Sequence, residues 1–124
     1  MTLKLYHYPR CSTCVKARKF LAEHGLKAEE VDLAQSPPDE AELRSIHRAS
    51  QRPLKALFNT SGQSYRGGDF KTRLPKMSEA EAFAALAADG MLIKRPILIG
   101  GDFALIGFKS EAWSEQLAIG EASP

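Results

Sequence analysis

The sequence predicts an α/β fold with a mixed four-stranded sheet. A helical insertion is expected in the chain between the second and third strands. Three observations predict this class. A strand–helix–strand pattern occupies residues 3–33, a long helical stretch follows it, and a β-hairpin with one more helix comes last. The first two strands are expected to be parallel because a helix crosses between them, whereas the hairpin strands are antiparallel.

The N-terminal unit begins with a strand predicted at residues 3–6, where apolar and polar side chains alternate. We expect the next helix to be capped by Ser12 or Thr13, since a short hydroxyl side chain can accept from the free N–H groups of the first turn. Gly25 is typical of the left-handed residue that ends a helix. A second strand is predicted at residues 28–33.

The insertion is expected at about residues 36–92, which is longer than a single crossover helix needs. One helix should start at residues 36–39, because proline is tolerated in the first turn of a helix. Another should start at Ser78, which forms a capping box with Glu81, and should end at Gly90.

The C-terminal unit is predicted to contain a strand after Pro96, a turn at residues 100–102 and a returning strand at residues 103–108. Ser110 is expected to cap the last helix, and residues 120–124 are expected to fray. This order, βαβ followed by an insertion and then ββα, is that of the thioredoxin-like fold.

The composition limits the classes of function. The 124 residues fit one domain, residues 1–124. A net charge of +2 is too small to indicate direct binding to nucleic acid, and no apolar run is long enough to span a membrane. The N-terminus lacks a signal peptide, so we expect a cytoplasmic protein, and a monomer. Because cytoplasmic thiols are kept reduced, a cysteine pair there is more typical of catalysis or sensing than of a permanent disulfide.

The two cysteines of the chain, Cys11 and Cys14, form a CxxC motif at the start of the first predicted helix. Helix N-termini favour negative charge, and Arg10, Lys16 and Arg18 make the neighbourhood basic. We therefore predict a lowered pKa and a nucleophilic thiolate at Cys11. Cys14 lies one turn into the helix on its apolar face. From there it can donate a hydrogen bond to the thiolate and later resolve a mixed disulfide.

The alternative to redox chemistry is a zinc site or a pair of inert thiols. Structural zinc requires four ligands, and the histidines of the chain are His7, His24 and His47. His24 lies at the far end of the first helix, so a complete set is hard to assemble, and no metal or other bound cofactor is predicted. We expect His7 to be a solvated loop residue; the alternative is a role beside the thiolate.

Arg95 and Pro96 form the second part of the predicted site. Proline cannot donate to a β-ladder, so its position at the mouth of a buried strand is unusual. In thioredoxin-like folds a cis-proline at this place lies beside the reactive cysteine. We predict that the Arg95–Pro96 bond is cis and that Arg95 faces the thiolate or an anionic substrate. The alternative is a surface arginine beside a strand.

Several motifs together resemble the ArsC/Spx family along essentially the whole chain. They are Tyr8-Pro9-Arg10-Cys11-Ser12-Thr13-Cys14, Lys16-Ala17, Asn59-Thr60-Ser61-Gly62, Leu92-Ile93-Lys94-Arg95-Pro96 and Gly107-Phe108. The resemblance is closest to the small ArsC-like proteins of the family, and it implies a thioredoxin-like fold and thiol-dependent reduction. The residues that it adds to the predicted thiolate or substrate environment are Arg10, Ser12, Thr13, Asn59 and Pro96.

The family includes arsenate reductases, in which one cysteine attacks arsenate within a cradle of three arginines. Cys11 and Arg95 match the nucleophile and one arginine. Asn59 stands where a second would fall and Gly107-Phe108 replaces the third, which weakens bidentate recognition of an oxyanion. The resemblance therefore implies a thiol–disulfide reductase, and the missing arginines disfavour arsenate or a related compound as its substrate. Glutathione, glutaredoxin or thioredoxin would supply the electrons.

The family also includes Spx-type regulators, which carry a CxxC redox switch and bind the C-terminal domain of the RNA polymerase α subunit. Cys11 and Cys14 match that switch. The basic C-terminal extension expected of Spx does not follow Trp113. A redox-sensing regulator is therefore the alternative function, and a reductase is the first.

Overall fold

A computed structural model of the chain describes residues 2–117. The strands are β1 (Leu3–His7), β2 (Ala28–Asp32), β3 (Ile97–Ile99) and β4 (Ala104–Ile106), in the order β2-β1-β3-β4. β1 pairs with β2 in parallel and with β3 antiparallel, and β3 pairs antiparallel with β4. The sheet is therefore mixed, and the predicted thioredoxin-like class is confirmed. The expectation that residues 120–124 fray lies outside the described residues.

Most of the helices lie between β2 and β3, whereas one joins β1 to β2 and one follows β4. The helices are α1 (Ser12–Glu23), α2 (Glu40–Ser50), α3 (Gln63–Gly67), α4 (Phe70–Arg73), α5 (Glu79–Ala88) and α6 (Ser110–Gln116), with the short 3-10 helices η1 (Leu54–Leu57), η2 (Leu74–Lys76) and η3 (Gly90–Leu92). The elements from α2 to η3 form the predicted helical insertion. None of the described helices combines the length and apolar character needed to cross a membrane.

The caps of the first and last helices differ from the predicted ones. Cys11 occupies the cap position of α1, with an extended backbone at φ −91° and ψ 119° and no capping hydrogen bond from its side chain, so the prediction of Ser12 or Thr13 was wrong. Lys109 rather than Ser110 occupies the cap position of α6. In each case the chain turns into the helix one residue earlier than its hydroxyl residue indicated. The hydroxyl side chains therefore lie within the first turn.

The helix starts within the insertion agree better with the sequence. The carboxylate of Asp39 accepts the Glu42 N–H at 2.8 Å and caps α2, with the preceding prolines outside the helix rather than in its first turn. The capping box of Ser78 and Glu81 at α5 is complete. Gly25 adopts φ +69° after α1, as predicted.

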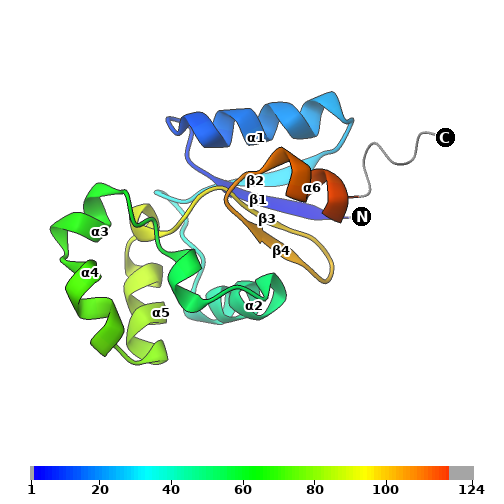
Figure 1. Cartoon of the computed structure of the whole chain (residues 1–124). Helices are drawn as coiled ribbons and strands as arrows, with labels where there is room; N and C mark the ends of the chain where they lie inside the picture. Colours follow the sequence, from blue (N-terminus) through cyan, green and yellow to red (C-terminus); the bar gives the residue numbers. More distant parts are fainter. Residues whose placement is uncertain (1, 118–124) are drawn as a thin grey trace.

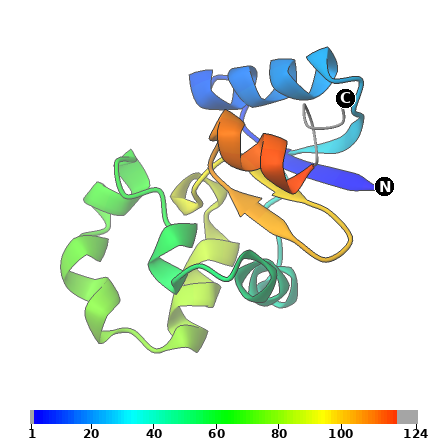
Figure 2. The same ribbon diagram turned by 45° about the vertical axis from the view of Figure 1, so that its right-hand side comes forward.

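The two faces of the sheet bury separate apolar cores. α1 and α6 cover one face, where Leu5, Phe20 and Trp113 meet. α2 lies against the other face, and Tyr6 joins Leu86 of the insertion in the core there. Leu5 and Tyr6 serve opposite cores because successive side chains of a strand point to opposite faces. The helices α3 to α5 extend beyond one end of the sheet (Figure 1, Figure 2).

Two contacts fix the insertion to the sheet. The Tyr6 hydroxyl donates a hydrogen bond to the carboxylate of Glu42 in α2, and Lys4 Nζ lies 3.1 Å from the same carboxylate. At the other end of the insertion, buried Gly90 packs directly on the backbone after β2. A Cβ atom at position 90 would lie 1.8 Å from the carbonyl oxygen of Leu33.

Candidate active site

The CxxC motif lies at the end of the sheet from which the insertion extends. β1 ends at His7, and residues 8–11 lead from it into the N-terminal end of α1 (Figure 1). β3 begins at the same end, because Tyr6 near the end of β1 pairs with Ile97 at the start of β3. The topology therefore brings Arg95 and Pro96, which precede Ile97, to the start of α1.

Cys11 is the partly exposed cysteine of the pair. Partial burial raises the pKa of its thiol, but several groups act more strongly in the opposite direction. The N–H groups of Cys14 and Thr13, the Cys14 thiol and the charge of Arg95 all favour the thiolate, so the pKa lies below its ordinary value. The start of α1 and an arginine far along the chain thus prepare Cys11 as a nucleophile.

Cys14 is fully buried, with 0% of its surface exposed. Burial raises the pKa of its thiol to about 12, and the adjacent Cys11 sulfur adds to that rise. The Tyr8 N–H donates to Cys14 Sγ across 3.4 Å, and it and the Arg95 charge only partly offset the rise. Both thiols are free. The pair therefore combines an accessible, acidic thiol with a buried thiol that holds its proton.

Arg95 lies beside this pair. The Arg95–Pro96 bond is cis, as predicted, and Pro96 is buried. The Arg95 guanidinium lies over the Tyr8 ring, with its Cζ atom 5.3 Å from the ring centre. Its Nη1 donates a long hydrogen bond of 3.4 Å to the carbonyl oxygen of Met91. The side chain is half-buried, so it is not a surface arginine of the kind considered as the alternative.

The side chains of several other residues near the motif are exposed. Arg10 and Ser12 are exposed, and Arg18 is turned toward β2, where its Nη2 lies 3.1 Å from a carboxylate oxygen of Glu30. Thr13 is exposed and borders a groove of about 620 Å³ that runs along β4 and α6. Arg95 is therefore the arginine whose charge lowers the pKa of Cys11 most directly.

His7 is buried at the last position of β1, with 7% of its surface exposed, so the expectation of a solvated loop residue was wrong. β1 is one residue longer than predicted, which turns this side chain to the α1 face of the sheet. Its Nε2 lies 3.9 Å from Glu30, and its Nδ1 lacks a hydrogen-bond partner within residues 2–117. Across the same residues, no three His, Cys, Asp or Glu side chains are grouped to hold a metal.

A cavity of about 350 Å³ opens beside Arg95 on the insertion side. Asn59, from the loop before α3, lines it together with Arg66 from α3 and Met91 from η3. Asn59 was predicted in the substrate environment, whereas Arg66 was missed. Arg66 approaches Arg95 because α3 packs on η3. The available signal was its position four residues after Gly62, at the end of the Asn59–Gly62 motif.

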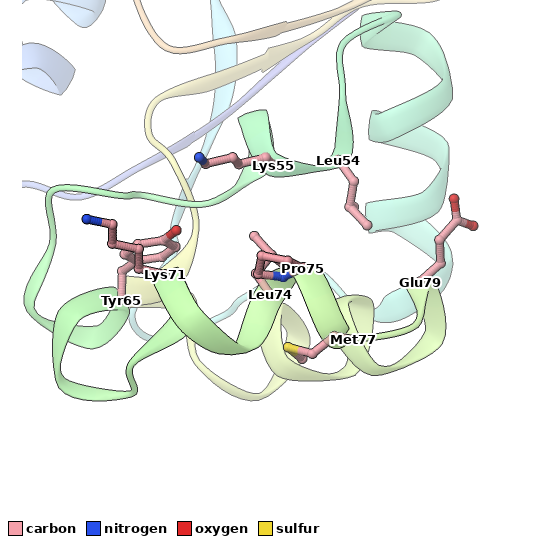
Figure 3. Close-up of a pocket in the computed structure, with 8 residues that line it drawn as sticks. All are labelled: Leu54, Lys55, Tyr65, Lys71, Leu74, Pro75, Met77 and Glu79. Carbon is pink, nitrogen blue, oxygen red and sulfur yellow. The ribbon is translucent and has the colours of Figure 1, made fainter.

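A separate cavity of about 270 Å³ lies within the insertion (Figure 3). Its lining consists of Leu54, Lys55, Tyr65, Lys71, Leu74, Pro75, Met77 and Glu79. Figure 3 shows apolar side chains of η1 and η2 facing one another, with the two lysine amines at one side. Neither cysteine and no part of Arg95 borders this cavity, so it is distinct from the cysteine site.

Comparison with known proteins agrees with this geometry. The ArsC family model matches residues 6–116. The uncharacterized protein YusI of Bacillus subtilis is 45% identical over 118 residues, which cover 95% of this chain and 100% of YusI. The crystal structure of an ArsC family related protein from Bacteroides fragilis superposes with a TM-score of 0.89. The two are 38% identical, and the match covers 93% of this chain and 97% of that one.

More distant relatives carry two kinds of name. The regulatory protein MgsR of Bacillus subtilis is 26% identical over 86% of this chain and 82% of its own length. An arsenate reductase of Neisseria meningitidis is 27% identical over 85% of this chain and 89% of its own length. The family match spans both cysteines, the whole insertion and Arg95, and the chain therefore belongs to the ArsC family.

Proposed function

We propose that this chain is a thiol–disulfide reductase in which Cys11 is the nucleophile and Cys14 the resolving thiol. The observation that carries the proposal is that the two thiols differ in exposure and that their pKa values are shifted in opposite directions. Cys11 is accessible and its pKa is lowered, whereas Cys14 is buried and its pKa is raised. This division suits a reaction in which one sulfur attacks first and the other waits.

The reaction begins when the Cys11 thiolate attacks one sulfur of a substrate disulfide. A Cys11–substrate disulfide forms, and the other half of the substrate leaves as a thiolate. Cys14 then loses its proton to solvent and attacks Cys11 Sγ, which forms the Cys11–Cys14 disulfide and releases the second substrate thiolate. Two electrons pass to the substrate. Glutaredoxin, thioredoxin or glutathione restores both thiols by the same exchange in reverse.

The pKa of Cys14 is expected to change between these steps. Burial raises it, and the hydrogen bond and charge of the Cys11 sulfur raise it further. Once Cys11 is bonded to the substrate, its sulfur carries no charge, so the contribution from Cys11 disappears while burial remains. The charge of Arg95 then favours the Cys14 thiolate. The pair would thus release the second proton only when the mixed disulfide exists.

The test measures reduction of hydroxyethyl disulfide and of arsenate, with glutathione and glutaredoxin or with thioredoxin as electron donor. We expect the disulfide to be reduced in preference to arsenate, because Asn59 stands where an arsenate reductase has an arginine. Cys11→Ser should abolish turnover, and Cys14→Ser should accumulate a mixed disulfide visible in the intact mass. Val15→Ala, at an exposed position of α1, is the matched control. Full activity in Cys11→Ser would disprove the assignment.

A redox-sensing regulator is the second candidate. It is favoured by the relationship to MgsR, whose name describes a regulator, and by the CxxC switch that the resemblance to Spx implies. Oxidation to a Cys11–Cys14 disulfide would then change binding to the C-terminal domain of the RNA polymerase α subunit. A pull-down with that domain, comparing reduced and oxidised protein, decides this candidate. Absence of binding in both states rules the regulator out.

A further inference from the structure

The cavity beside Arg95 has the composition of an anion site. Two arginines, Arg66 and Arg95, border the same space of about 350 Å³. The other polar lining comes from neutral groups, including those of Asn59, Ser61 and Ser64, and no carboxylate borders the cavity within the described residues. Two cations without a lining anion leave this space favourable for a negatively charged ligand group.

The loop before α3 holds one of these cations in place. Arg66 donates a hydrogen bond from Nη2 to the carbonyl oxygen of Ser61 at 2.6 Å, which orients the planar guanidinium. The Gly62 N–H donates to the carbonyl oxygen of Asn59 at 3.0 Å and closes the turn. A Cβ atom at position 62 would lie 2.6 Å from Asn59 Nδ2, so glycine leaves room for that amide beside the cavity.

Arg95 connects the cavity to the reactive sulfur. It borders the cavity, and its charge also acts on Cys11. Its Nε is buried and has no hydrogen-bond partner within residues 2–117. A guanidinium carries five N–H donors in a rigid fork. In Arg95, the one hydrogen bond found within these residues, to Met91, is long at 3.4 Å. The Nη groups of Arg95 therefore keep donors for a ligand that reaches Cys11.

We infer that this cavity binds a carboxylate of the disulfide substrate, with Arg66 as a specificity-determining residue that acts together with Arg95. A carboxylate presents two oxygens in a plane, which match the fork of an arginine. The inference rests on the proposed reductase function and names its substrate class, small disulfides that carry a carboxylate near the sulfur. Arg66 supplies a positive charge to the cavity that Asn59 also borders, and Asn59 stands where an arsenate reductase has an arginine.

The test isolates the first chemical step, so that no electron donor is needed. In the Cys14→Ser background, the rate constant for mixed-disulfide formation at Cys11 is measured by intact mass with three disulfides. These are dithiodipropionate, which is a dianion, hydroxyethyl disulfide, which is neutral, and cystamine, which is a dication. We expect the dianion to react fastest. Arg66→Gln should lower the ratio of the dianion rate to the neutral rate by about tenfold, as expected for a charge-assisted hydrogen bond.

Arg48→Gln is the matched control, because it removes the same charge from an exposed position on α2. It should leave the ratio unchanged. An equal fall in Arg48→Gln and Arg66→Gln would show that net charge alone attracts the dianion, and would overturn the inference. Equal rates for all three disulfides would overturn it too, while the reductase proposal would stand. If Cys11 reacts with none of them, the reductase proposal itself fails.

Discussion

Cys11 and Cys14 differ in acidity because the same turn of helix places them in different surroundings. The sulfur of Cys11 faces the free N–H groups at the start of α1, whereas that of Cys14 is buried behind it. The charge that helps most comes from Arg95, which is 84 positions from Cys11 along the chain and two residues before the pairing partner of Tyr6. Residues of the CxxC neighbourhood thus lower the pKa of Cys11 together with a residue that precedes another strand.

Replacement of Arg95 by methionine should make Cys11 a weaker nucleophile at neutral pH. The charge of Arg95 favours the thiolate, so its loss raises the pKa of Cys11 and moves the midpoint of the alkylation profile to higher pH. The measurement is the iodoacetamide rate against pH in the Cys14→Ser background. Lys16→Met, an exposed cation on α1, should leave the midpoint in place. An unmoved midpoint in Arg95→Met would contradict this account of the site.

At the scale of single elements, the insertion depends on a few local interactions: two helix caps and one close backbone approach. α5 begins with a complete capping box, and η3 begins where Asp89 accepts the Met91 N–H at 3.0 Å. Between them the chain must pass close to the backbone after β2, and glycine at position 90 allows that approach. η3 in turn carries Met91, which borders the cavity beside Arg95.

Gly90→Ala should destabilise the protein strongly. Its Cβ would meet the carbonyl oxygen of Leu33 at 1.8 Å, and a backbone group cannot move aside like a flexible side chain. We expect a loss of about 2 kcal/mol or more in the free energy of unfolding, measured with urea. Gly101→Ala is the matched control, because a Cβ at position 101 meets nothing within 4 Å. Equal stability of the two variants would refute this packing argument.

Ser78→Ala should lower the free energy of unfolding less than Gly90→Ala, because it removes one helix cap and introduces no clash. Ser78 Oγ accepts the Glu81 N–H at 3.1 Å, and the Glu81 carboxylate accepts the Ser78 N–H at 2.8 Å. Loss of the serine cap should lower the free energy of unfolding by about 1 kcal/mol. Ser45→Ala, at an exposed position within α2, should be neutral or slightly stabilising. A Ser78→Ala variant as stable as Ser45→Ala would show that the cap contributes little.

At the scale of the whole molecule, the sheet is a layer between two apolar cores, and the reactive cysteines lie where the sheet, α1 and the insertion meet. Tyr6 is the residue of β1 that connects this sheet to the insertion by a hydrogen bond as well as by packing. Burial raises the pKa of its hydroxyl to about 12, and the hydrogen bond to Glu42 supports the same direction. The connection is therefore sensitive to alkaline pH.

In Tyr6→Phe, the free energy of unfolding should fall less steeply as the pH rises above 10. The pKa of Tyr6 rises from 10.0 to about 12 on folding, so the unfolded chain loses this proton first. The resulting stabilisation is complete below pH 10 and is lost as pH rises toward 12. At neutral pH the variant should lose about 1–3 kcal/mol, since it leaves a charged acceptor without this donor. Urea unfolding of both proteins from pH 7 to 11 measures the difference, and parallel curves would contradict it.

The buried Cys14 thiol titrates in the same alkaline range, because burial raises its pKa to about 12. It is present in both proteins and affects both curves alike. The comparison with Tyr6→Phe therefore reports Tyr6 together with Lys4, whose pKa the Tyr6 hydroxyl and Glu42 raise, and the Cys14→Ser background provides a second check. If the difference between the curves vanished in that background, it would belong to the cysteine.

Much of this molecule is encoded locally. Alternation and helix periodicity place the strands and α1, and glycine and proline mark where they end, because these patterns act on neighbouring residues. A CxxC motif at a helix start carries its own reason for an acidic first thiol. Proline before a buried strand, together with the thioredoxin-like order of elements, predicted the cis bond, which the structure confirms. The motifs quoted for the family were sufficient to predict the ArsC family match.

Tertiary structure alone decided which side chains meet. Arg10 and Arg18 are close to Cys11 in sequence, yet one is exposed and the other pairs with Glu30. Arg95 and Arg66 border a common cavity because β3 pairs with β1 and α3 packs on η3. Local patterns specify backbone conformation, but such a meeting depends on how separate elements pack across long loops. The physical reason is that electrostatic and packing interactions depend on distance in space, whereas sequence periodicity reports only on residues that are close along the chain.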